Sequence, residues 1–253
     1  MVRIAVLSDV HGNTPALAAV LAAVDAEGVD LVLNLGDIAS GAVDPRGTLD
    51  LLAGLPGVVT VRGNHERQVL TLPRGRMGAS DRLADSVLTG ADRDRLAALP
   101  LTATPVPGVL AFHASPDDDL GHLTETVTPG GLREATDAEV VERLGAAYGR
   151  YALFLCGHTH VARSRRLPDG SLVVNPGSVG WPAFDDDQPH HYRVEAGSPD
   201  ARYAIVDGEG RGWEARLRSV AYDHERAADL ARVNGRPDVA HALRTGRMPV
   251  VGG

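Results

Sequence analysis

The sequence predicts an α/β protein in which strands of a largely parallel sheet alternate with helices. Short apolar runs at 2–7 and 31–35 each end in polar residues, and a helix-forming segment follows each run. Nearly continuous apolar runs are typical of strands covered on both faces, and their alternation with helices is typical of parallel sheets. A chain of 253 residues also buries roughly 75% of the surface that its unfolded form exposes. We therefore predict a single domain over residues 1–253.

Composition limits the classes of function. The formal net charge is -8, and the one basic cluster is Arg163, Arg165 and Arg166, so non-specific binding to nucleic acid or to a membrane has little electrostatic basis. Small soluble substrates fit this charge better. The single cysteine, Cys156, forms no internal disulfide, and we expect it in the core. No run is long and apolar enough for a membrane span or a signal segment, which predicts a cytoplasmic protein.

The first third of the chain repeats one strand–loop–helix unit. Thr14 is predicted as the N-cap of the first helix, with Pro15 at its first helical position and Gly28 ending it. The predicted units are strand 2–7 with helix 16–26, strand 31–35 with helix 44–55, and strand 58–61. Each strand therefore ends in a loop that carries polar residues.

The rest of the chain predicts two helical excursions, at about 73–100 and 115–149, and a second half richer in strands. Capping boxes at Thr89/Asp92 and Thr136/Glu139 indicate helix starts within the excursions. The other predicted elements are strands 109–112 and 151–156, a hairpin turning at 169–170, a loop at about 181–200 that is a possible lid, a hairpin of 202–206 with 213–220, and a helix at 224–233.

Potential metal ligands collect where the predicted strands end. They are Asp9, His11, Asp37, Asn64, His65, His113, His158 and His160, which include five of the ten histidines. The carboxyl ends of strands form the edge where open α/β sheets bind ligands. Mixed carboxylate, amide and imidazole ligands suit manganese, iron or zinc, and are too rich in nitrogen for a calcium or magnesium cage. Because the set exceeds one coordination sphere, we expect two ions ~3.5–4 Å apart that share a carboxylate and a water.

The segment Gly157-His158-Thr159-His160 by itself leaves two readings open. Its imidazoles at i and i+2 can reach one small volume and grip metal ions or a phosphate. Two exposed loop histidines are an equally good interpretation of this segment alone. The order of the other strand-end residues decides between them.

Five short motifs within residues 1 to about 180 resemble, in their order, the motifs of the calcineurin-like metallophosphoesterase family. They are Asp9-Val10-His11, Gly36-Asp37, Gly63-Asn64-His65-Glu66, His113 and Gly157-His158-Thr159-His160. The resemblance implies a four-layer α/β/β/α sandwich and two divalent transition-metal ions, with manganese favoured. It implies that Asp9, His11 and His160 bind one ion, that Asn64, His113 and His158 bind the other, and that Asp37 bridges them.

The resemblance also places His65 near the leaving oxygen as a residue that binds no metal. In the implied reaction a metal-bridging hydroxide attacks phosphorus, the ions offset the oxyanion charge, and His65 protonates or hydrogen-bonds the leaving group. The alternative for His65 is a solvent-facing residue at a helix start. Its neighbour Asn64, a proposed ligand, favours the catalytic role.

One departure from the family bears on the substrate. Protein serine/threonine phosphatases carry an acid and an arginine where this chain has Ser40 and Gly41. The chain is more similar to small prokaryotic phosphodiesterases and phosphatases, so we predict a binuclear metal-dependent hydrolase of small phosphodiesters or phosphomonoesters.

Other interpretations stay open. The chain could be a catalytically silent scaffold for protein partners, as a retromer subunit of this fold is thought to be, although a scaffold needs neither the full ligand set nor His65. A nuclease is disfavoured by the acidic charge. His190 and His191 could reach the site from the possible lid or lie in solvent, and the basic cluster could bind a distal phosphate or lie on the surface. We interpret the acidic runs 117–119 and 185–187 as solvated turns.

Overall fold

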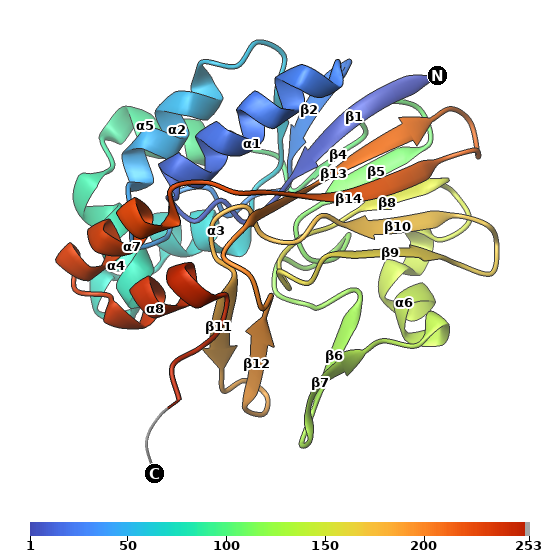
Figure 1. Cartoon of the computed structure of the whole chain (residues 1–253). Coiled ribbons are helices and arrows are strands. Elements are labelled where there is room, and N and C mark those ends of the chain that lie inside the picture. Colours follow the sequence, from blue (N-terminus) through green and yellow to red (C-terminus); the bar gives the residue numbers. More distant parts are fainter. Residues whose placement is uncertain (251–253) are drawn as a thin grey trace.

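The computed structural model describes residues 1–250 and contains two five-stranded sheets packed face to face (Figure 1). The first sheet has the order β14 (Glu214–Val220), β13 (Ala201–Gly208), β1 (Val2–Leu7), β2 (Leu31–Asn34) and β3 (Val59–Thr60). The second has the order β4 (Thr102–Ala103), β5 (Val109–Phe112), β8 (Leu153–Leu155), β10 (Leu172–Asn175) and β9 (Arg163–Arg166). In the first sheet β1, β2 and β3 run parallel, β13 is antiparallel to β1, and β14 is antiparallel to β13. In the second sheet β5, β8 and β10 run parallel, and the edge strands β4 and β9 are antiparallel to their neighbours.

Three apolar clusters separate four layers, as expected. Strand β1 illustrates the arrangement, because alternate side chains of a strand point to opposite faces. Ala5 and Leu7 pack under the helices that cover the first sheet, whereas Ile4 and Val6 pack between the two sheets. On the far side, α6 (Asp137–Leu144) covers the second sheet, and Phe154 and Cys156 lie buried beneath it. The α/β/β/α sandwich is therefore confirmed, and Cys156 is a core residue.

Helices α1 (Thr14–Glu27) and α2 (Pro45–Ala53) lie over the first sheet, and one predicted cap is wrong. The N-cap of α1 is Asn13, whose side-chain oxygen accepts the N–H of Ala16 at 3.2 Å. Thr14 is already helical, and its hydroxyl donates to Asp44, the N-cap of α2. Asn13 therefore caps α1, and Thr14 contacts the residue that caps α2.

The stretch 73–100 is helical, as predicted. It contains the 3₁₀ turn η1 (Arg74–Arg76), α4 (Ala79–Val87) and α5 (Gly90–Ala97), and it follows α3 (Asn64–Thr71). The capping box of Thr89 and Asp92 starts α5, and that of Thr136 and Glu139 starts α6. Both reciprocal hydrogen-bond pairs predicted from the sequence are present.

Three segments differ from the prediction. The first half of 115–149 is not helical but forms the hairpin β6 (Glu125–Thr128) and β7 (Gly131–Glu134), because β-branched residues flank a glycine-rich turn. The supposed loop at 181–200 contains the hairpin β11 (Ala183–Asp186) and β12 (Tyr192–Glu195). Helix α7 (His224–Val233) matches the prediction, but α8 (Pro237–Thr245) was missed although Pro237 and Gly246 mark its ends.

The missed segments border one edge of the sandwich. Helix α8 contacts β11, and β12 contacts β7, so these elements surround the loops that leave the carboxyl ends of the strands (Figure 1). Within residues 1–250, no helix combines the length and the apolarity that crossing a bilayer requires.

Candidate metal centre

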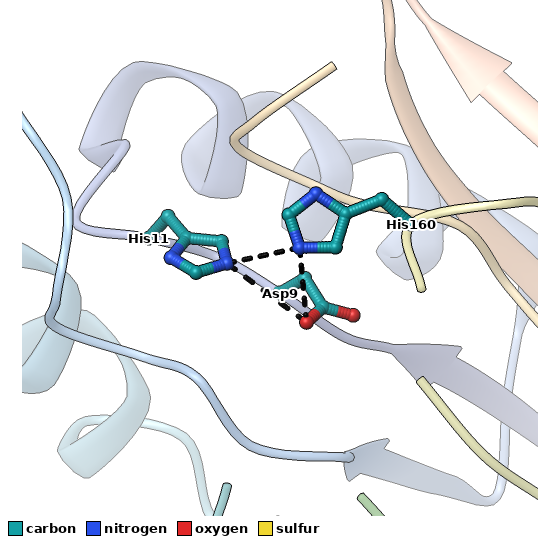
Figure 2. Close-up of side chains that lie close together, drawn as sticks. All are labelled: Asp9, His11 and His160. Carbon is teal, nitrogen blue, oxygen red and sulfur yellow. Dashed lines mark hydrogen bonds and ion pairs between the residues drawn. The ribbon is translucent and has the colours of Figure 1, made fainter. Parts of the chain in front are cut away.

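Three buried side chains that follow β1 and β8 form a first cluster (Figure 2). Nε2 of His160 lies 3.3 Å from Oδ1 of Asp9, and Nε2 of His11 lies 3.9 Å from the same oxygen. The two imidazole nitrogens are 3.1 Å apart. These atoms are close enough together to hold one metal ion.

In His11 and His160, the hydrogen bond made by Nδ1 determines whether Nε2, which faces the cluster, carries a hydrogen. Nδ1 of His11 donates to the carbonyl of Ser40 at 2.6 Å, and Nδ1 of His160 donates to the carbonyl of Trp181 at 2.8 Å. A carbonyl only accepts, so each Nδ1 carries a hydrogen and each neutral ring has its lone pair at Nε2. Two such lone pairs and a carboxylate oxygen face one another, and this arrangement needs a cation, a proton or a metal ion, between them.

Asp9 supplies the charge of this cluster. Its side chain is fully buried, and in the described part of the chain its Oδ1 makes no hydrogen bond. Its Oδ2 accepts the backbone N–H of His158 at 3.1 Å. Burial alone would raise the pKa of Asp9, but His160 and His113 lower it to about 2. A buried carboxylate with one free oxygen is what a divalent ion requires.

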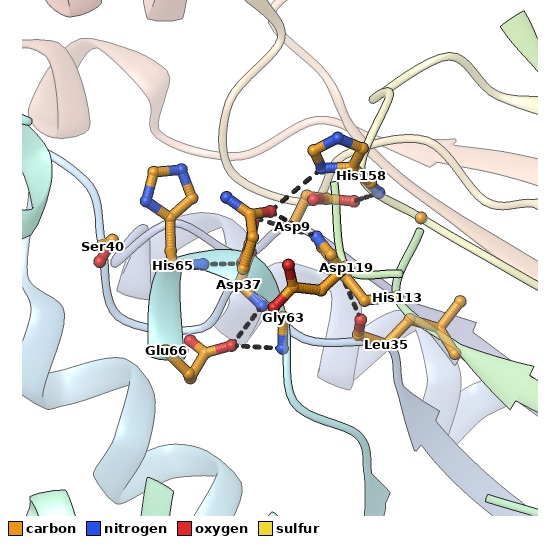
Figure 3. Close-up of polar contacts among 12 residues, drawn as sticks. Asp9, Leu35, Asp37, Ser40, Gly63, His65, Glu66, His113, Asp119 and His158 are labelled. Carbon is orange, nitrogen blue, oxygen red and sulfur yellow. Dashed lines mark hydrogen bonds and ion pairs between the residues drawn. The ribbon is translucent and has the colours of Figure 1, made fainter. Parts of the chain in front are cut away.

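A second cluster lies beside the first and contains Asp37, His113 and His158 together with Asn64 (Figure 3). Oδ1 of Asn64 lies 3.0 Å from Nε2 of His113 and 3.1 Å from Nδ1 of His158. The other ring nitrogens again donate to backbone carbonyls, His113 to Leu35 and His158 to Leu120. All four clustered histidines thus turn one nitrogen inward and anchor the other, which is the usual arrangement of metal-binding histidines.

Asp37 lies between the clusters. Its Oδ2 is 3.2 Å from Nε2 of His113 and 3.9 Å from Nε2 of His11, so one oxygen faces both groups. Its Oδ1 accepts the N–H of His65 at the start of α3, where the helix dipole favours an anion. Burial would raise the pKa of Asp37, but His113 and His65 hold it well below its usual range. The carboxylate can therefore contact two ions at once.

The charge states of the histidines suit ligands. Burial lowers the pKa of His11 and of His158 to about 3, so both rings are neutral at physiological pH. Burial also disfavours the charged form of His113, but Asp37 outweighs it and raises the pKa to about 10. Without a metal ion a proton therefore occupies this position, and a metal ion would displace it.

Backbone conformation marks the same residues. Within residues 1–250, the non-glycine residues with positive φ are Asp9 (56°), His11 (48°), Asp37 (54°), His158 (67°) and His160 (57°). Left-handed conformations are unfavourable for side chains with a Cβ and persist where the surrounding structure enforces them. All five are ligand candidates, so the backbone of these loops is strained at the residues whose side chains point into the clusters.

Glu66, which is 1% exposed, holds the Asp37 loop against α3. Its carboxylate accepts the N–H groups of Gly63 and Asp37 at 2.9 and 2.8 Å (Figure 3). It also accepts the N–H of Ile38 at 2.8 Å. Three backbone bonds to one buried side chain fix the loop relative to the helix that carries Asn64 and His65.

Comparison with known proteins agrees with this geometry. A family model described as the calcineurin-like phosphoesterase superfamily domain matches residues 2–196. The chain belongs to this superfamily. Its members are generally phosphoesterases that bind divalent metals, and the two ligand clusters fall in the matched region.

Three relatives of this calcineurin-like chain match over nearly its whole length. An uncharacterized protein of Methanocaldococcus jannaschii is 26% identical over 93% of this chain and 94% of its own. The crystal structure of a metallophosphoesterase from Sphaerobacter thermophilus matches with a TM-score of 0.72 at 24% identity, covering 96% of this chain and 99% of the other. That of a hypothetical protein from Pyrococcus horikoshii has a TM-score of 0.75 at 21% identity, covering 98% and 100%. The two structures support the fold.

The departure from the protein phosphatase pattern has a steric reason in this calcineurin-like chain. A Cβ at Gly41 would lie 1.6 Å from the carbonyl oxygen of His11. No arginine fits at this position, because even a methyl group overlaps the backbone of a candidate ligand. The neighbouring Ser40 contributes its carbonyl, which fixes the ring of His11.

An acid does contact His65, but it comes from elsewhere. Oδ1 of Asp81 in α4 accepts a hydrogen bond from Nδ1 of His65 at 2.6 Å, and Asp81 is 2% exposed. Burial opposes the charged form of His65, but Asp37 and Asp81 raise its pKa to about 9. The His65 ring lies 5.3 Å from that of His11. Sequence reasoning missed Asp81, because no spacing links it to His65; an aspartate on the buried face of a helix was its only signal.

The remaining candidates lie away from the clusters. His190 and His191 are exposed in the turn between β11 and β12, and they do not line the cavity beside the clusters. Arg163 pairs with the buried Glu125, and Arg165 bonds Asp137, so these arginines hold β6, β7 and α6 to the second sheet. Asp119 is not a solvated turn residue. Its carboxylate makes a two-pronged ion pair with Arg67, with N–O distances of 2.6 and 2.8 Å.

Proposed function

We propose that this chain is a binuclear metal-dependent phosphoesterase that hydrolyses small phosphodiesters or phosphomonoesters. One observation carries the proposal: four histidines, of which His11, His113 and His160 are buried, each donate one ring N–H to a backbone carbonyl and turn the other nitrogen toward Asp9, Asp37 or Asn64. Structural histidines rarely converge in this way, whereas metal-binding histidines almost always have such anchors.

The proposed ligand sets follow the clusters. Asp9, His11 and His160 would hold one ion, Asn64, His113 and His158 would hold the other, and Asp37 would contact both. Two divalent ions at these positions would neutralise phosphate charge and lower the pKa of a water molecule toward neutrality. The donor chemistry supports manganese, iron or zinc, with manganese favoured.

The chain's own residues would carry the remaining steps. His65 is protonated at neutral pH because of its two carboxylate neighbours, and it borders the cavity beside both clusters. It would donate a proton or a hydrogen bond to the oxygen that leaves phosphorus. Asp81 would keep Nδ1 of His65 protonated and turn Nε2 toward the substrate. The acidic net charge supports a small substrate rather than nucleic acid. We also propose a cytoplasmic location.

Metal reconstitution tests the proposal. The purified protein, loaded separately with manganese, iron and zinc, should contain two ions per chain by elemental analysis and should hydrolyse bis(p-nitrophenyl) phosphate or p-nitrophenyl phosphate. A chelator should abolish turnover, and added metal should restore it. Full activity with at most one ion per chain would refute the binuclear site. Two bound ions with no hydrolysis of any ester would favour the scaffold interpretation, and activity on DNA that falls steeply with salt would favour a nuclease.

A further inference from the structure

The cavity beside the two clusters is much larger than a phosphate group needs. Its volume is about 540 Å³, within the range of small-molecule pockets. One end is lined by His11, Asp37 and His158 of the clusters, and the rest is lined in part by residues of the β11–β12 hairpin and of the start of α8. If the clusters bind the phosphate, the remaining volume must receive the organic part of the ester.

One wall of this outer part is aromatic and continuous with the first cluster. The Trp181 ring stands edge to face with His11 at 4.9 Å, and the Phe184 ring with His160 at 4.7 Å. Tyr192 continues the wall, 6.1 Å from Phe184 between ring centroids. Trp181 and Phe184 are partly exposed. A wall of this kind offers a flat apolar surface next to the candidate ligands His11 and His160.

The outer part carries several acceptor groups, and the exposed Arg76 also lines it. Asp185, Asp186 and Gln188 of the hairpin line it, and Gln68 faces it from α3. Arg236 also borders the cavity, but its guanidinium is held by Asp238 at 2.6 Å and lies over the Trp181 ring at 5.6 Å.

We propose that this site takes phosphoesters with a heteroaromatic ring, such as the base of a nucleoside, and that the ring packs on Trp181, Phe184 and Tyr192. The inference rests on the proposed function. Flat faces match the aromatic wall, and the N–H groups on the edge of a base match carboxylate and amide acceptors, as Asp and Gln pair with bases elsewhere. An acyl chain would leave these acceptors unpaired.

Catalysis tests the inference with substrates that differ only in the base. kcat/KM for adenosine 5′-monophosphate should exceed that for ribose 5-phosphate by roughly 5- to 150-fold, the usual worth of one stacked base. The methyl diesters of the two compounds should show the same ratio of kcat/KM. A ratio near one for both pairs would overturn the inference.

Variants of the wall provide a second catalytic test. Phe184→Leu and Tyr192→Leu keep an apolar side chain but remove the ring. Each should lower the ratio of kcat/KM between adenosine 5′-monophosphate and ribose 5-phosphate by about 5-fold or more, the lower end of the range for one stacked base. Leu217→Ala, on the outer strand β14 and 39% exposed, is the control and should leave the ratio unchanged. Metal content must stay at the wild-type level, because Phe184 contacts a candidate ligand. If both variants kept metal and the wild-type ratio, the aromatic wall would not bind the substrate.

Fluorescence provides a readout that needs no turnover. The chain has two tryptophans; Trp181 lines the cavity and Trp213 is buried in the core, so a base in the cavity should quench the emission of Trp181 alone. Adenosine should quench the metal-loaded protein, and ribose should not. Quenching without hydrolysis of any ester would keep the base site and refute the proposed function. Hydrolysis of alkyl esters without quenching would support the proposed function and refute the base site. Tighter binding of choline than of adenosine would mean a site for a quaternary ammonium and would overturn the inference.

Discussion

Nδ1 of His65 lies 2.6 Å from the buried Oδ1 of Asp81, although the two residues come from different helices. The bond fixes which nitrogen carries a hydrogen in the neutral ring and directs Nε2 to the cavity that both ligand clusters border. In protein phosphatases the resemblance places the corresponding acid after the Gly-Asp motif, where this chain has Ser40. In this chain the acid that contacts His65 comes from a different segment, α4.

Asp81→Asn is expected to lower kcat about 10²-fold or more and to leave metal content and fold unchanged. The amide keeps the size of the side chain but no longer favours the protonated ring, so His65 loses its orientation and its tautomer. Steady-state kinetics with elemental analysis check this. Asp94→Asn, on the exposed face of α5, is the control. Wild-type turnover in Asp81→Asn would make the contact purely structural.

His65→Ala is expected to keep both ions while kcat falls by roughly 10²–10⁴-fold, the usual contribution of a positioned acid. The defect should depend on the leaving group when chemistry limits the rate. An alkoxide needs a proton, whereas p-nitrophenolate departs as an anion, so alkyl esters should lose most activity. kcat/KM over a series of leaving groups measures the effect. An equal loss across the series would indicate that His65 stabilises charge instead, and loss of metal would make it a ligand.

Asp37→Asn is expected to be the most damaging single ligand substitution. One oxygen of this side chain faces both clusters, so the neutral amide weakens two sites at once. Turnover should fall below detection, and the occupancy of both ions should decrease by elemental analysis. The comparison variant is His160→Ala, which should deplete mainly one ion. Near wild-type metal content and activity in Asp37→Asn would exclude a bridging role.

Gly41→Ala is expected to lower the free energy of unfolding by about 1–3 kcal/mol, as overpacking usually does, and to reduce metal binding. The new methyl group would overlap the carbonyl of His11 and displace that ligand. Thermal unfolding with and without metal measures both effects. Gly75→Ala is a matched control because a Cβ there meets no atom within 4 Å. Unchanged stability in Gly41→Ala would show that the loop yields without moving His11.

Local patterns were sufficient where one stretch of chain decides its own structure. The run at 2–7 forms β1 with the predicted bounds, and the predicted helix at 224–233 forms α7 with no shift. Both capping boxes are present, because their hydrogen bonds join residues only three positions apart. The hairpins at 125–134 and 183–195 were missed, since each depends on pairing between short strands with weak patterns of their own.

The sequence by itself determined the superfamily, the sandwich and the list of candidate ligands, because strands end in Asp, His and Asn in a specific order and parallel strands bring their ends to one edge. Only the tertiary structure decided which candidates share a cluster, that Asp37 faces both groups, that Asp81 contacts His65, and that the β11–β12 hairpin builds an aromatic wall beside them. These relations join residues from 16 to about 150 positions apart, as the pairs His65–Asp81 and Asp9–His158 illustrate. Distances of that kind depend on how layers pack, and no local preference of the chain encodes them.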